Sequence, residues 1–248
     1  MNNLLNGVRD FVAEWSVTIL ILLFGTTTLM QAFVVPTSSM ESTVLVGDHL
    51  IVDKLAYAPA GSFSKYLLPY TDIKRGDIIV FKFPPQPTTM YVKRVMGLPG
   101  DHLRVEKKVV ILNGHKLDEP YTQHIDPNLA PYRDDFPSTP VGLGQYYERV
   151  TDMLEHHVDR NTNEIVVPEG FYFAMGDNRD NSSDSRYWGF VPRDNIIGKP
   201  FVIFWSYDTN TENLVDFRLE HFIDLATHFF SKTRWDRTLK LVRGVEIK

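Results

Sequence analysis

Three residues with side-chain hydroxyls, Thr37-Ser38-Ser39, directly follow the one long apolar stretch of the chain. Serine and threonine at such a position are typical of a solvated linker after an apolar helix. A serine hydroxyl can also be a nucleophile, but it is inert at neutral pH unless a neighbouring base accepts its proton. Ser39 is therefore a candidate nucleophile, and its assignment depends on finding that base.

The base could be a histidine or a lysine. No histidine falls in a recognisable triad motif, and nothing in the sequence supports a Ser-His-Asp site. Lys93 lies in an apolar run where the two-residue alternation of a strand puts Tyr91, Lys93 and Val95 on one face. Burial there would lower the pKa of the amine toward neutrality, where it can take a proton from serine. The alternative is a lysine at a strand edge whose charged end reaches water.

A third group of chemically active residues follows an apolar run and reads GDNRDNSSDSRYWG over residues 176–189. A solvated loop would account for the polarity, whereas the compact mixture of Asp177, Arg179, Asp184 and Arg186 indicates a network of mutually satisfied charges that shapes a site. A calcium loop is the rival interpretation. The two arginines would place positive charge beside such an ion, and the prediction is a site without metal or other cofactor.

Size and composition limit the classes of protein. The chain has 248 residues, of which 43% are hydrophobic and 23% charged, an ordinary globular balance. Its formal charge of −5 argues against nucleic acid as a partner. The absence of cysteine excludes disulfide scaffolds, zinc ribbons and thiol catalysis, and it suits an oxidising compartment.

The apolar stretch covers residues 15–35 and carries no charge. As a helix it would span roughly 30 Å, one bilayer core. Its exit, Phe33-Val34-Val35-Pro36, lacks the small residues of a cleavage site, so an uncleaved transmembrane anchor is predicted. Arg9 is the only basic residue before it, and acidic residues count little in the charge rule, so residues 1–14 are predicted to be a short cytoplasmic N-terminus.

The rest of the chain is predicted to be mainly β, with a core formed by residues 36–104 and 166–248. Short apolar or alternating runs separated by Gly-Asp turns indicate its strands. The runs cover residues 49–52, 78–81, 91–95, 171–175 and 201–205. The aromatic loop 57–70 could pack on its own core or rest on a membrane surface, where aromatic side chains are favoured.

Residues 105–165 are predicted to be an insertion into this core. Asn113-Gly114 between apolar runs indicates a β-hairpin. Residues 118–163 are rich in proline and have poor apolar periodicity, so they are interpreted as a variable lobe outside the core, and His156-His157 as surface residues. Apolar residues at three- and four-residue steps over 212–230 predict a C-terminal amphipathic helix, packed on the body or on a membrane.

Taken together, these motifs resemble the bacterial type I signal peptidases, membrane proteases with a Ser/Lys dyad. The resemblance rests on Ser39-Met40 after the anchor, on Tyr91-Val92-Lys93-Arg94 with Gly97-Leu98-Pro99-Gly100-Asp101, and on the loop 176–186. It covers residues 36–104 and 166–207 well. It implies a signal-peptidase-like β catalytic domain behind one transmembrane helix, with the inserted lobe and the C-terminal helix outside the likeness.

The resemblance also implies roles. Ser39 is matched to the nucleophile, Lys93 to the general base, and Thr37, with the Ser39 N–H, to the oxyanion hole. Ser182 is matched to the hydroxyl that orients the lysine amine. Asp177, Arg179, Asp184 and Arg186 are matched to supporting positions. The expected substrate pocket, for small residues in an Ala-X-Ala pattern, is formed by Val35, Met40, Val44, Tyr91 and Val92.

One departure from the family pattern is Ser42, which stands where proline is usual and which would loosen the turn after the nucleophile. The expected substrates are secretory preproteins, and the expected surroundings are the lipid bilayer and the translocation machinery. The expected place is the bacterial cytoplasmic membrane, with the catalytic domain on the outer face. The rivals are a self-cleaving Ser/Lys regulator, which would lack the anchor, and a non-catalytic adaptor, which would be expected to have lost Ser39, Lys93 or Ser182.

Overall fold

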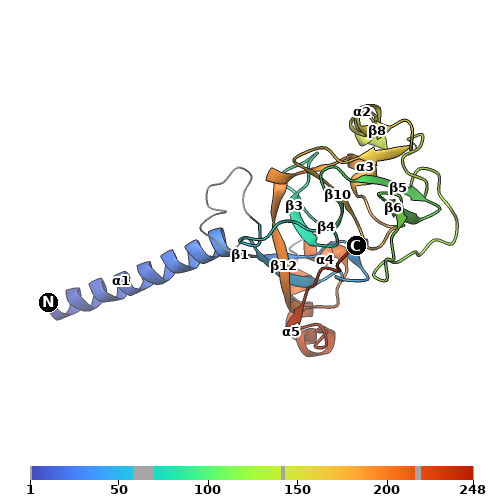
Figure 1. Ribbon diagram of the computed structural model, residues 1–248. Helices are drawn as coiled ribbons and strands as arrows, with labels where there is room; N and C mark the ends of the chain where they lie inside the picture. Colours follow the sequence, from blue (N-terminus) through green and yellow to red (C-terminus); the bar gives the residue numbers. More distant parts are fainter. Residues whose placement is uncertain (1, 58–69, 141–142, 216–218, 248) are drawn as a thin grey trace.

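A computed structural model describes residues 2–57, 70–140, 143–215 and 219–247, and the expected aromatic loop lies largely outside them. Helix α1 (Asn2–Phe24) projects from a β-rich body that contains the rest of the described chain (Figure 1). The mainly β fold with an apolar N-terminal helix, predicted from the sequence, is confirmed.

The apolar N-terminal helix is shorter at its C-terminal end than predicted. A π-helical turn (Gly25–Leu29) continues α1, and residues Arg9–Leu29 are together long and apolar enough to cross a membrane. Strand β1 (Met30–Val34) then pairs with β2 (Asp48–Asp53), so the expectation of an anchor over 15–35 is wrong for its last residues. Uncharged composition alone does not distinguish a lipid-facing helix from a strand that pairs at the rim of a sheet.

Two antiparallel sheets form the body. The larger has the order β1-β2-β12-β3-β4-β10-β11, with β13 paired to β12, and the smaller has the order β7-β6-β5-β9-β8. The strands of the larger sheet not yet bounded are β3 (Ile78–Lys82), β4 (Met90–Gly97), β10 (Phe171–Met175), β11 (Val191–Pro192), β12 (Ile196–Ser206) and β13 (Lys240–Leu241). Those of the smaller are β5 (His102–Glu106), β6 (Val109–Leu112), β7 (His115–Lys116), β8 (Val158–Asp159) and β9 (Glu164–Val166).

The predicted hairpin is present between β6 and β7, where Asn113 and Gly114 have φ angles of 50° and 81°. Positive φ at both central residues is what a two-residue type I′ turn requires. The interpretation of the following lobe as lying outside the core is wrong. Tyr132, Phe136 and Val150 are buried in one apolar cluster with Phe173 of β10. Irregular segments anchored by single aromatic side chains have no periodic signal, which is why the pattern missed them.

Short helices complete the described chain, and none of them covers the larger sheet as a full layer (Figure 1). They are η2 (Ser38–Met40), η4 (Gly144–Tyr146), α2 (Tyr147–His157), α3 (Ser185–Trp188), η5 (Arg193–Asn195), α4 (Thr211–Val215) and α5 (Leu219–Lys232). The predicted C-terminal helix thus corresponds to α4 and α5. Helix α5 packs on β12 through the stacked rings of Phe229 and Trp205, while Phe230 remains 79% exposed.

Candidate active site

The turn that carries Ser39 is held in place by the strands on either side of it. Strand β1 leads into an extended Thr37, after which Ser38, Ser39 and Met40 form the single turn η2. The backbone of Val35 is bonded in both directions, with its N–H donating to Asp48 O and its carbonyl accepting from Gly47 N. The Ser39 side chain is therefore fixed at the C-terminal end of an edge strand, and the residue is only 8% exposed.

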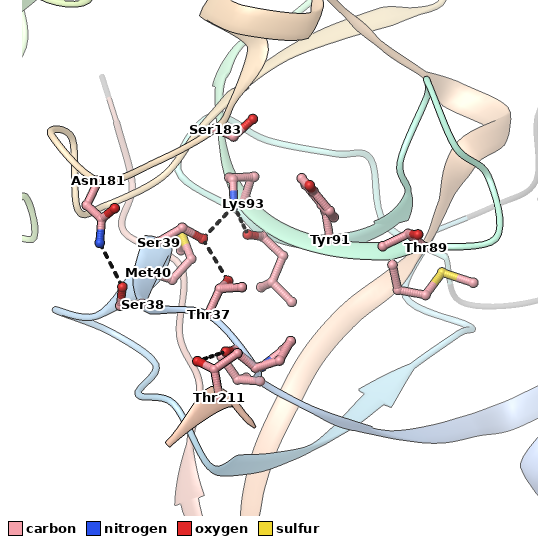
Figure 2. A pocket seen from close by; sticks show the side chains of 14 residues that line it. Thr37, Ser38, Ser39, Met40, Thr89, Tyr91, Lys93, Asn181, Ser183 and Thr211 are labelled. Atoms are coloured by element: carbon pink, nitrogen blue, oxygen red, sulfur yellow. Dashed lines mark hydrogen bonds between the residues drawn. The ribbon is translucent and has the colours of Figure 1, made fainter. Parts of the chain in front are cut away.

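Lys93 is brought to Ser39 by strand β4. Its Nζ lies 2.6 Å from Ser39 Oγ and 3.0 Å from the carbonyl oxygen of Val92 (Figure 2). The residue is only 3% exposed. Burial lowers the pKa of the Lys93 amine to about 8, although the charges of Asp184 and Asp177 oppose the shift. The sequence-predicted nucleophile and base are thus neighbours, and the amine is a competent proton acceptor near neutral pH.

Two further hydroxyls surround the pair. Thr37 Oγ1 lies 3.5 Å from Ser39 Oγ, on the side of the serine away from Lys93 (Figure 2). The Ser182 hydroxyl is buried without a hydrogen-bond partner, and no bond joins it to Lys93 in the described part of the chain, where Val92 O is the second partner of the amine. A Cβ on Gly176 would lie 2.2 Å from Ser182 Oγ and 2.5 Å from Ser39 O. Glycine at 176 therefore allows this loop to approach the nucleophile closely.

Ion pairs support the loop 176–186. Asp177 receives two hydrogen bonds from Arg94, at 2.7 and 2.6 Å, and both side chains are buried. Asp184 caps α3 and pairs with Arg186 at 2.8 Å. Burial opposes ionisation of Asp184, but the charge and hydrogen bonds of Arg186 hold the pKa of this carboxyl below its usual range. Of the mutual pairs that the sequence predicted among the four charged residues of this loop, the structure contains Asp184–Arg186, whereas Asp177 pairs with Arg94 of β4.

The remaining supporting residue, Arg179, pairs with a residue that the sequence analysis did not single out. Its guanidinium donates to both carboxylate oxygens of Glu119, from the inserted lobe. Arg94, next to Lys93 on β4, is likewise paired with a carboxylate from a distant segment, Asp177. Neither partner could be identified from spacing, because Asp177 and Glu119 are far from these arginines in sequence and meet them only through the fold.

A cavity of about 530 Å³ opens over the Ser39–Lys93 pair. Val35, Met40, Tyr91 and Val92 line it as expected. Val44 does not, because it has no exposed surface and packs in the apolar cluster behind Met40. Other lining residues were not predicted: Pro36, Ser38, Thr89, Met90, Asn181, Ser183 and Thr211.

Two of these unpredicted residues hold the nucleophile turn. Asn181 Nδ2 donates to Ser38 Oγ at 2.9 Å, and Thr211 Oγ1 donates to the carbonyl oxygen of Pro36 at 2.6 Å (Figure 2). Ser38, which had no expected chemistry, therefore connects the nucleophile turn to the 176–186 loop. No histidine lines the cavity among the described residues.

Comparison with known proteins places the chain in a family. The family model described as "Signal peptidase, peptidase S26" matches residues 8–205. A signal peptidase I of Aquifex aeolicus (strain VF5) is 37% identical over 230 residues, 80% of this chain and 85% of that protein. A signal peptidase I of Pseudomonas aeruginosa is 35% identical over 205 residues, 76% of this chain and 70% of that protein. The chain therefore belongs to the signal peptidase family, peptidase S26, and is a serine endopeptidase of that family.

A solved structure is also similar. The crystal structure of a signal peptidase I from Enterococcus faecalis V583 has 32% sequence identity and covers 52% of this chain and 97% of its own, with a TM-score of 0.38.

Proposed function

We propose that this chain is anchored in the membrane by residues Arg9–Leu29 and removes N-terminal signal peptides from exported preproteins. Ser39 is the nucleophile, and neutral Lys93 is the general base. Cleavage follows small-X-small sites. The observation that carries the proposal is the 2.6 Å approach of Lys93 Nζ to Ser39 Oγ inside a cavity, with the amine desolvated.

The substrate binds as an extended strand. On one side, β4 is paired with β3 along the whole run from Met90 to Arg94. On its other side, β4 is paired with β10 only from Arg94 onward. One edge of Met90–Val92 thus faces the cavity, and the segment from Val35 to Thr37 faces it from the other side (Figure 2). A peptide inserted between them can add backbone hydrogen bonds to an unpaired edge, which is a recurrent mode of peptide recognition.

The reaction then runs through one residue pair. Neutral Lys93 takes the proton of Ser39 as Oγ attacks the scissile carbonyl, and the resulting ammonium later protonates the leaving amine. The Thr37 hydroxyl and the Ser39 N–H donate to the oxyanion. Water then attacks the acyl-enzyme as Lys93 takes one of its protons, and the ammonium gives this proton to Ser39 Oγ as the acyl–serine bond breaks. Ser182, buried and with a free hydroxyl, is available to receive a hydrogen bond from the ammonium.

Specificity for small residues follows from the walls near Ser39. Val35, Met40 and Val92 are apolar and line the cavity beside the nucleophile, and Tyr91 lines it further along β4. The anchor holds the site at the height where a substrate tethered by its own signal helix leaves the bilayer, which supplies orientation and local concentration. With the N-terminus inside, the catalytic domain lies on the outer face of the membrane.

The dyad is tested with a purified preprotein in detergent. Ser39→Ala and Lys93→Ala are each expected to lower kcat by on the order of 10⁴-fold or more, because the nucleophile and its base act as one unit. Tm of each variant, measured by circular dichroism, is expected to stay within a few degrees of wild type. Retained processing by either folded variant would refute the dyad.

A further inference from the structure

The inserted lobe reaches the catalytic loop through its first segment, residues 119–123, here called the strap. Gln123 N donates to Asp177 O at 2.8 Å, and Arg179 N donates to Gln123 O at 3.0 Å. These bonds form a short parallel bridge between Gln123 and Asn178, and Asn178 N in turn donates to Ser39 O at 3.1 Å. The strap is therefore two backbone hydrogen-bond steps from the nucleophile.

Tyr121, in the middle of the strap, covers the buried ion pair behind the site. Its ring centroid lies 3.9 Å from the Arg94 guanidinium carbon, whose nitrogens bind Asp177. This distance is within the range of a cation–π contact. The Tyr121 hydroxyl donates to Glu119 Oε1 at 2.9 Å, which fixes the orientation of the ring. The ring excludes water from Arg94–Asp177, and an ion pair is stronger where the local dielectric is low.

The strap also holds the turn that follows the nucleophile. The Ser42 hydroxyl donates to the carbonyl oxygen of Tyr121. The backbone hydrogen bonds of this turn are donated by Glu41, Thr43 and Val44. A proline at 42 would restrict φ without displacing any of those donors. Here serine stands instead, and its hydroxyl connects the turn to the lobe.

We infer that the strap positions the Ser39 turn against strand β4, and that Tyr121 is its positioning residue. Tyr121 is not among the residues that line the cavity, so it acts through Arg94, Asp177 and Ser42 rather than on substrate. The inference rests on the proposed Ser39–Lys93 dyad, and it assigns a role to the lobe, in which the sequence motifs indicated no functional residue.

Substitution of Tyr121 separates positioning from stability. Tyr121→Leu is expected to lower kcat for preprotein cleavage about tenfold with KM within about twofold, because small displacements of reacting groups cost rate rather than affinity. It should also move the acid limb of the kcat/KM profile to higher pH, since a loosened Arg94 compensates less for the Asp177 charge that acts on Lys93. Tyr121→Phe keeps the ring over Arg94 but loses the hydrogen bond to Glu119, so its kcat and pH profile should lie much closer to wild type than those of Tyr121→Leu.

Val150 supplies the matched control. It is fully buried on α2 of the same lobe, and the main contacts of α2 are with η4, α3, β8 and β9. Val150→Ala is expected to lower Tm while leaving kcat and the pH profile at wild-type values below the unfolding transition. If Val150→Ala reproduces the kinetic changes of Tyr121→Leu, or if Tyr121→Leu has the wild-type kcat and profile, the inference is wrong.

Ser42 tests the second contact of the strap. Ser42→Ala removes the hydroxyl and is expected to lower kcat about threefold, since one exposed hydrogen bond contributes modestly. Ser42→Pro should restore wild-type kcat by restricting the turn directly. Equal kcat for wild type and Ser42→Ala would overturn the link between strap and nucleophile turn. The Ser39→Ala variant distinguishes failure of the proposed dyad from failure of the strap inference. If the dyad is wrong, Ser39→Ala remains active. If only the strap inference is wrong, Ser39→Ala is inactive while Tyr121→Leu has the wild-type kcat and pH profile.

Discussion

Lys93 and Arg94 are neighbours on β4, and both are buried, with exposed fractions of 3% and 1%. They point to opposite faces of the strand and meet opposite surroundings. The Arg94 guanidinium donates to Asp177, to Gly76 O and to Thr43 Oγ1. Among the described residues, the Lys93 amine bonds to a hydroxyl and a carbonyl oxygen and lies 5.2 Å from the centre of the Tyr91 ring, and no carboxylate is within hydrogen-bonding distance of it.

This difference shows how one strand can supply both a structural cation and a base. Burial disfavours charge on either side chain, and the Arg94 guanidinium is paired with a bonded carboxylate. Lys93 receives only the more distant fields of Asp184 and Asp177, which oppose but do not cancel the effect of burial on its pKa. Arginine is also the better residue for a two-pronged carboxylate contact, whereas lysine loses its proton more readily when buried.

The largest expected contrast is in stability between methionine variants of the two residues. Arg94→Met leaves Asp177 buried without its main partner and is expected to lower the free energy of unfolding by about 3–5 kcal/mol. Lys93→Met removes a desolvated amine in favour of an apolar chain of similar length, so the free energy of unfolding should be unchanged or higher at pH 7. Urea unfolding at pH 7, followed by tryptophan fluorescence, measures both.

Arg94→Lys is the control that keeps the positive charge and removes the paired hydrogen bonds to Asp177. It keeps a cation beside Asp177 but cannot reproduce the paired donation at 2.7 and 2.6 Å, so its stability should fall between wild type and Arg94→Met. A loss of stability in Lys93→Met as large as that in Arg94→Met would contradict the proposed contrast between the two faces.

The pH profile tests the same contrast through activity. Because the pKa of Lys93 is lowered to about 8, kcat/KM is expected to rise with pH through a single ionisation near that value and then level off. A flat profile from pH 6 to pH 10 would argue against an amine base.

The same ionisation of Lys93 also makes the free energy of unfolding depend on pH in a defined direction. The pKa of an unfolded lysine is about 10.4, so between about pH 8 and that value the unfolded chain binds a proton that folded Lys93 does not. The free energy of unfolding contributed by this group therefore rises with pH across that window. The difference between wild type and Lys93→Met isolates the contribution, and a difference that falls with pH would contradict the assignment.

Much of this geometry could be predicted from the sequence because it is local. The two-residue alternation around Lys93 and the Gly-Asp turns predicted strands β2, β3 and β4. The Ser39 motif and the 176–186 loop led, through family resemblance, to the proposed dyad. The Asn113-Gly114 hairpin required only two residues.

What could not be predicted depends on contacts between distant segments. The partner of Arg179 is Glu119, in a segment without apolar periodicity, and the ring over Arg94 is Tyr121 from that same segment. Val44 was assigned to the pocket because its position matched the family, but side-chain direction placed it in the core behind Met40. The end of the anchor was also misplaced, since β1 is as uncharged as the helix before it.

The smallest expected effect is that of a chelator, and it tests whether arginine or a metal neutralises the carboxylates of the 176–186 loop. Asp177 is bonded to Arg94 and Asp184 to Arg186, while Asp180 is 3.0 Å from Lys108 Nζ. Each of these carboxylates thus already has a cationic partner, and a calcium ion would have to displace it against charge repulsion. We expect an excess of EDTA, added at physiological ionic strength, to leave preprotein cleavage within experimental error of the untreated enzyme. If EDTA inhibits cleavage and added Ca²⁺ reverses the inhibition, a metal ion rather than Arg94 neutralises the carboxylates of this loop.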